Sequence, residues 1–154
     1  MKKTKMFMLA LVCLMMQSVA CFADVLPIPD DDKPIAAQQL PAAVKTFIQQ
    51  YFPKLEVAYA EKDTEFLGTT YEVRLSDGTK LEFDKKGNWD KVDRKTKAVP
   101  AALVPKAISS YVAKNFPGQL ITKIDKERYG YEVELSNDVD LKFNKKGGFI
   151  GMGD

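Results

Sequence analysis

The sequence predicts an α+β protein built from two tandem repeats, each a helix followed by about four antiparallel strands. Three observations support this prediction: the second half of the chain repeats the first, the apolar period changes from helical to strand-like within each half, and turn signals separate the strands. A single repeat of this size can cover only one face of its sheet. We therefore expect one antiparallel sheet shared by both repeats, with both helices on one face.

The internal repeat is visible in three ungapped stretches. Residues 40–53, LPAAVKTFIQQYFP, correspond to residues 104–117, VPKAISSYVAKNFP. Residues 71–76, YEVRLS, correspond to 131–136, YEVELS, and residues 81–87, LEFDKKG, to 141–147, LKFNKKG. This self-similarity predicts a first repeat over residues 40–94, a linker over 95–99 and a second repeat over 100–154.

Each repeat is expected to open with a helix. Apolar residues at the i, i+3, i+4 and i+7 or i+8 spacing form one stripe on each: Val44, Phe47, Ile48 and Tyr51, then Ile108, Tyr111, Val112 and Phe116. Pro41 and Pro105 suit a first helical turn, where a missing N–H costs nothing. Pro53 and Pro117 end the helices, because a proline disfavours the helical conformation of the residue before it.

After each helix the apolar period becomes 2, which is typical of half-buried strands. The alternating residues in the first repeat are Leu55, Val57 and Tyr59, then Tyr71, Val73 and Leu75, then Leu81 and Phe83. Asp77-Gly78 predicts a tight hairpin turn, and Lys86-Gly87-Asn88 predicts the next reversal. A fourth strand is expected over residues 88–93, with residues 149–152 as its counterpart.

The N-terminal segment is typical of an exported protein. Three lysines precede an apolar stretch too short to span a membrane, and small residues follow, so residues 1–23 are expected to be a signal peptide. Cleavage after Ala23 would give a soluble periplasmic protein beginning at Asp24, and cleavage before Cys21 would give a lipid-anchored one. Residues 24–39, rich in Pro and Asp, are expected to form an extended leader.

Charge argues against a nucleic-acid partner. The chain has 23 Lys plus Arg and 21 Asp plus Glu, but the signal removes three lysines and no acid. That leaves 20 basic against 21 acidic side chains. Electrostatic attraction to nucleic acid or anionic lipid therefore loses its support. No transmembrane segment is expected in the processed chain.

The residue types present disfavour an enzyme. The chain has no His, and both cysteines, Cys13 and Cys21, lie in or beside the signal, so no catalytic residue, metal site or cofactor is expected. Consecutive carboxylates at Asp30, Asp31 and Asp32 lack the alternate spacing of a calcium-binding loop. A hydrolase using paired carboxylates remains a minor alternative, since several acids fall on one face of the sheet.

The sheet face away from the helices is the candidate binding surface, which we call the open face. Strand alternation places carboxylates and basic residues there in an interleaved pattern. Trp89 is added because tryptophan is enriched at binding hot spots, although its position after a turn leaves its face ambiguous. The candidate partner-binding residues are Glu72, Arg74, Lys80, Glu82, Trp89, Glu132, Glu134, Asp140 and Lys142.

Several of these segments resemble a known family. Asp32-Lys33-Pro34-Ile35, the Leu40-Pro41 to Phe52-Pro53 helix, Tyr71-Glu72-Val73 and the Asp77-Gly78 hairpin are together similar to the beta-lactamase-inhibitor-like, PepSY-like family of exported bacterial proteins. The resemblance implies a tandem helix-plus-sheet fold similar to that of the beta-lactamase inhibitory protein, whose open sheet grips a partner protein. It implies no catalytic residues.

These observations favour a non-enzymatic exported binding module. The partner would be a protein or peptide of the cell envelope held on the open face, and an envelope peptidase is one such target. The alternative is an envelope structural or sensing protein that self-associates through exposed strand edges.

Overall fold

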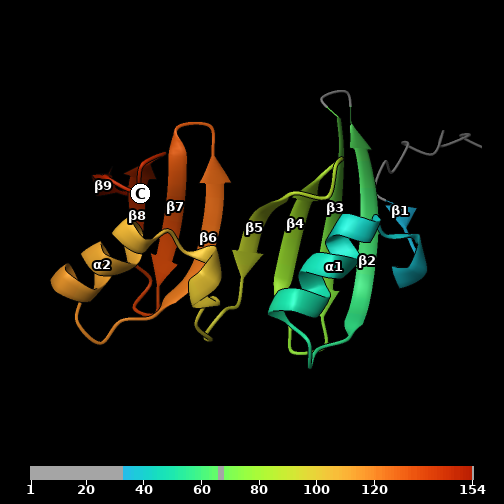
Figure 1. Ribbon diagram of the computed structural model, residues 1–154, viewed down its shortest axis with the longest axis horizontal. Helices are drawn as coiled ribbons and strands as arrows, with labels where there is room; N and C mark the ends of the chain where they lie inside the picture. The colour runs from blue at the N-terminus through green and yellow to red at the C-terminus, as the bar shows by residue number, and fades with distance from the viewer. Residues whose placement is uncertain (1–32, 66–67, 154) are drawn as a thin grey trace, which may run out of the picture.

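The computed structural model describes residues 33–65 and 68–153 and shows one nine-stranded antiparallel sheet. The strands follow chain order from β1 to β9, so each pairs with its neighbours in sequence. Two helices lie on the same face (Figure 1). The predicted α+β tandem-repeat fold is confirmed. The expected signal peptide and most of the leader lie outside the described residues.

Each repeat contributes one helix and four strands, and the first is preceded by one more short strand. Helix α1 spans Ala42–Tyr51 and α2 spans Lys106–Asn115. Short 3-10 turns precede them at Ala37–Gln39 (η1) and Ala101–Leu103 (η2). The strands are β1 Lys33–Pro34, β2 Val57–Glu65, β3 Gly68–Leu75, β4 Lys80–Asp84, β5 Trp89–Asp93, β6 Ile121–Glu127, β7 Gly130–Leu135, β8 Asp140–Asn144 and β9 Phe149–Met152.

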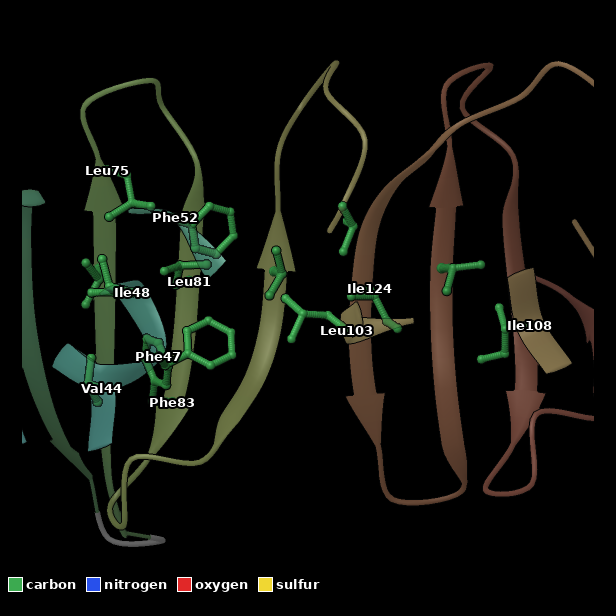
Figure 2. Packing of buried hydrophobic residues seen from close by; sticks show 14 of the residues in the cluster. Val44, Phe47, Ile48, Phe52, Leu75, Leu81, Phe83, Leu103, Ile108 and Ile124 are labelled. Atoms are coloured by element: carbon green, nitrogen blue, oxygen red, sulfur yellow. The ribbon is translucent and has the colours of Figure 1, made fainter. Parts of the chain in front are cut away.

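The helices pack as their apolar stripes predict. Val44, Phe47 and Ile48 of α1 are buried, as are Ile108 and Val112 of α2. They cover the apolar face of the sheet, and the buried side chains of both repeats form one continuous cluster. Figure 2 shows this cluster extending from one half of the sheet to the other. The two repeats therefore share a core, as well as a sheet.

The repeats join between β5 and β6. Val92 pairs with Ile124 across this boundary, and both side chains are fully buried. Leu103 of η2 is buried in the same cluster, and it lies near Ile124 where the halves meet (Figure 2). The linker is held to the sheet by a hydrogen bond from the Val99 N–H to the Ile121 carbonyl. The join is therefore a continuous part of the sheet and core.

The expected orientation of Tyr59 is wrong. A β-bulge between Val57 and Tyr59 inserts one extra residue into β2, which reverses the alternation after it. Ala60 consequently faces the core, and the Tyr59 side chain is exposed. The same bulge recurs in β6, where it buries Thr122.

Part of the expected leader belongs to the sheet. Lys33 and Pro34 form β1 and pair with Lys62 and Glu61 of β2. The Ile35 N–H then donates to the Ala60 carbonyl, and the Ile35 side chain packs against the core. The absence of periodicity over residues 24–39 did not reveal this strand, because only two residues pair.

Candidate functional site

The open face carries two rows of polar side chains that cross the whole sheet. Strand partners directly opposite one another point to the same side, so the pairings define each row. One row reads Glu61, Glu72, Glu82, Lys91, Asp125, Glu132 and Lys142, and the other reads Tyr59, Arg74, Lys80, Asp93, Lys123, Glu134 and Asp140. Eight of the nine predicted site residues therefore share one surface.

Sequence reasoning missed the centre of this surface. Lys91 and Asp93 of β5, and Lys123 and Asp125 of β6, lie in the same rows and connect the two repeats. Their strand alternation was available in the sequence. What the sequence did not show is that β5 and β6 are neighbours, which places these four charges in the middle of the face.

Ion pairs order the middle of the open face. Lys80 Nζ lies 2.7 Å from Glu72 and 3.2 Å from Glu82. Lys91 Nζ lies 2.9 Å from Asp125 and 3.6 Å from Glu82, so it bridges the repeat boundary. Burial disfavours the charge of both lysines, but these carboxylates outweigh it and raise the pKa of each. Both lysines therefore stay charged across the physiological range.

The first repeat contains an acidic hollow on this face. A cavity of about 250 Å³ is lined by Thr70, Tyr71, Phe83 and five carboxylates, namely Glu61, Asp63, Glu72, Glu82 and Asp90. Tyr59 donates a 2.7 Å hydrogen bond to Glu61, which fixes one wall. We call this hollow, defined by its five carboxylates, the acidic pocket.

Asp90 enters the acidic pocket because of a second β-bulge. Phe83 pairs with Trp89 and Glu82 pairs with Lys91, which leaves Asp90 as the extra residue of β5. Burial raises the pKa of Asp90, and the neighbouring Asp84 carboxylate raises it further. A group whose charge is disfavoured in this way would gain from a cation placed beside it.

The second repeat, over its described residues, does not reproduce this set of carboxylates. The matching positions hold Asp125, Glu127 and Glu132, but Lys142 replaces Glu82 and Ile150 replaces Asp90. Two of the five carboxylates are therefore lost, and one position gains a positive charge. Over its described residues, the second repeat therefore lacks a full counterpart of the acidic pocket.

The placement of Trp89 on the open face is wrong. Its ring packs on the helix side, with its centroid 6.4 Å from that of Phe47. Lys126 Nζ lies 3.5 Å above the ring and donates to the Trp89 carbonyl at 2.8 Å. The bulge at Asp90 explains the difference, because it changes which residues of β5 share a face. Trp89 is part of the core rim.

The part of the chain that the structure describes shows no group of three or more His, Cys, Asp or Glu side chains arranged to hold a metal ion. In the same residues, neither helix is long or apolar enough to cross a bilayer.

The fold defines a class: a tandem helix-plus-sheet protein in which both helices cover one face and a charged face is left open. A comparison of the sequence with models of protein families supports this class. A family model described as "Putative beta-lactamase-inhibitor-like, PepSY-like" matches residues 30–67 and 69–151. The chain belongs to this PepSY-like family.

Solved structures from Bacteroides species resemble the chain closely. A "putative calcium-regulated periplasmic protein" from Bacteroides thetaiotaomicron is 45% identical, with a TM-score of 0.77 over 81% of this chain and 98% of that one. Two described as putative periplasmic proteins from Bacteroides vulgatus are 37% and 44% identical, with TM-scores of 0.77 and 0.76. They cover 80% and 82% of this chain, and 99% of each of theirs is covered. No curated protein matches the chain.

Proposed function

We propose that the chain is a non-enzymatic, exported binding module that holds an envelope protein or peptide on its open face. The observation that carries the proposal is a nine-stranded sheet with both helices on one side and ordered charged rows on the other. Membership in an inhibitor-like family supports a protein partner. The periplasmic relatives support export, and the signal peptide at residues 1–23 would direct it.

We propose the acidic pocket as the recognition point, with a Lys or Arg side chain of the partner as its occupant. Five carboxylates line it, and Lys80 and Lys91 form ion pairs with Glu72, Glu82 and Asp125 at its side toward the repeat boundary. A guanidinium or ammonium group entering there would stabilise the charged form of Asp90, whose pKa is raised by burial first and by the Asp84 carboxylate second. The other residues of the two rows on the first repeat would then supply the polar rim of the interface.

The direct test changes the pocket without breaking the ion pairs around it. Asp90→Asn with Glu61→Gln removes two negative charges, and the amide oxygen introduced by Glu61→Gln keeps an acceptor for Tyr59. Reversing Lys80 would be a poor test, because it would set a third carboxylate between Glu72 and Glu82. Glu132→Gln is the matched control, since it lies in the same row on the second repeat.

The measurement is capture by crosslinking from the envelope fraction, followed by titration calorimetry with the captured protein. We expect the pocket variant to bind at least about tenfold more weakly and to lose most of the salt dependence. Glu132→Gln should bind like the wild type. Equal affinity of all three proteins would overturn the acidic pocket as the recognition point, and capture of nothing would overturn the binding module.

The same experiment tests Ca²⁺ as a competitor of the partner's basic side chain for the acidic pocket. One relative is described as calcium-regulated, and carboxylate oxygens are the ligands that Ca²⁺ prefers. Release of the partner by calcium, reversed by EDTA, would show that calcium regulates the same surface. If calcium has no effect at fixed ionic strength, the pocket binds the partner's basic side chain and does not bind calcium.

A further inference from the structure

The last strand, β9, forms an exposed edge of the sheet. Within the described residues it pairs only with β8, so its outer backbone groups have no strand beside them. Its side chains are apolar and exposed: Phe149 by 40%, Ile150 by 56% and Met152 by 59%. Natural proteins usually blunt such an edge with charge, proline or a covering element. In the part of the chain that the structure describes, β9 has no charge, proline or covering element at its outer edge, and it is blunted only by its four-residue length and the bulge at Ile150.

The first repeat shows what occupies this position when a partner strand is present. β5 is the equivalent of β9, because Phe83 pairs with Trp89 as Phe143 pairs with Phe149. β6 pairs with the outer edge of β5, and it leaves Val92 fully buried. The residue equivalent to Val92 is Met152, which is mostly exposed. β9 is therefore a strand built like an interior one but left at the end.

The two equivalent strands differ in charge. β5 carries Asp90, Lys91 and Asp93, and Lys91 forms an ion pair with Asp125 of β6. The matching residues after Phe149 are Ile150, Gly151 and Gly153, so β9 has no charge that would select or repel a charged strand. An uncharged strand is compatible with a copy of itself, since a two-fold axis then brings no like charges together.

The opposite edge of the sheet is blocked. β1 is only two residues long, contains Pro34, and pairs with β2 at Lys62 and Glu61. A proline cannot donate to a further strand, and β1 occupies the edge of β2 that a head-to-tail neighbour would need. Pairing of β9 with the β1 edge of a second copy is therefore disfavoured. Open-ended filaments, which need that contact, are disfavoured as well.

We propose that β9 pairs antiparallel with β9 of a second copy, forming a closed two-fold dimer with a continuous sheet. The contact would cover Phe149, Ile150 and Met152 and satisfy the outer backbone groups of both strands. Because the strand has four residues, the dimer is expected to be weak and concentration-dependent. This inference is separate from the proposed partner binding, which uses the acidic pocket on the first repeat.

The test is sedimentation velocity on the purified exported chain over a wide concentration range. The wild type should pass from monomer to dimer as concentration rises. Ile150→Asp with Gly151→Glu adds two negative charges to this edge, which a two-fold pair of β9 strands would bring close to their copies. The carboxylate introduced at 151 faces Lys142 of β8, and a Cβ at 151 meets no atom within 4 Å. We expect this variant to fold and to dimerise at least about tenfold more weakly. Leu120→Lys is the control, because Leu120 is exposed by 48% and lies directly before β6, not in β9. This variant should dimerise like the wild type.

Unchanged circular dichroism and thermal midpoint would establish that the β9 variant is folded. A wild type that stays monomeric throughout would overturn the proposal and leave the edge to a strand from another protein. Dimers that survive Ile150→Asp with Gly151→Glu, or that disappear equally in Leu120→Lys, would overturn it too. Growth beyond dimers would overturn the closed two-fold arrangement.

Discussion

The Asp77 carboxylate ties the β3–β4 hairpin to the linker, and its removal provides a sharp test of the fold. Asp77 lies in the turn between β3 and β4, and only 11% of its side chain is exposed. It accepts a hydrogen bond from the Thr79 N–H at 3.0 Å, and it pairs with Arg94 at 3.1 Å and Lys97 at 2.9 Å. Arg94 also donates to the Ala98 carbonyl, so the network reaches the segment before the second repeat.

The cost of Asp77→Ala follows from these three bonds. The backbone bond is worth about 1 kcal/mol, and a bond to a charged, mostly buried partner such as Arg94 about 1.5 to 3 kcal/mol. Lys97 is half exposed, so its pair adds about 0.5 kcal/mol at most. Because water replaces part of what is lost, we expect a decrease of about 3 kcal/mol in the free energy of unfolding. For a chain of this length that lowers the thermal midpoint by roughly 6 to 12 °C.

Chemical denaturation with fluorescence detection measures this cost. Asn137 is the matched control, because it holds the equivalent turn position and its side chain makes no hydrogen bond within the described residues. Asn137→Ala should cost less than about 0.5 kcal/mol. Asp77→Asn should cost about half as much as Asp77→Ala, since it retains an acceptor for Thr79. Equal, small effects of Asp77→Ala and Asn137→Ala would refute the network.

The same network predicts how stability depends on pH. Burial would raise the pKa of Asp77, but hydrogen bonds from Thr79, Lys97 and Arg94 outweigh it and hold the pKa far below its ordinary value of 3.8. A depressed pKa in the folded state means that the contribution is fully present above the unfolded value and is lost as the pH falls below it. Between about pH 5 and about pH 2, wild-type stability should therefore fall more steeply than that of Asp77→Asn. Parallel curves would show that Asp77 carries no such linkage.

Three further predictions concern the join, a strand start and the core rim. Ile124→Ala should cost about 3 kcal/mol, because it opens a cavity at the join, and one unfolding transition should shift as a whole; two separate transitions would contradict the shared core. Gly130→Ala should cost more than about 2 kcal/mol, because a Cβ there would clash with the Phe143 carbonyl oxygen; denaturation would show it. Lys126→Met should cost about 1 kcal/mol and shift the fluorescence of Trp89, the single tryptophan, because the cation leaves its ring; an unchanged spectrum would contradict that contact.

The sequence was sufficient for the two helices, the main strands and the fold class, because each depends on local signals, but it did not reveal β1. The apolar stripes identified both helices, and the strand period together with Asp77-Gly78 identified the β3–β4 hairpin. Prediction from the sequence failed where one inserted residue reverses the side of the sheet to which the following side chains of a strand point. The bulge before Tyr59 and the bulge at Asp90 have no local signature, and each reversed an orientation that a period of 2 predicts.

The acidic pocket could not be predicted for the same reason. Glu72 and Glu82 follow from strand alternation, but Asp90 joins them only through its bulge, and Glu61 only through the reversal in β2. The burial of Trp89 is the other consequence of the bulge in β5. The bulge in β5 thus places the Asp90 carboxylate on the open face and the Trp89 ring beside Phe47.

The two repeats have kept one fold while their fourth strands have taken different roles. In the first repeat this strand is interior, and its charges serve the join through Lys91 and the pocket through Asp90. In the second repeat Ile150 and Gly151 replace those charges, so the same bulge now presents an apolar residue at a free edge. Under these two proposals, the first repeat recognises the partner through the acidic pocket, and the second repeat pairs with its copy through the uncharged edge of β9.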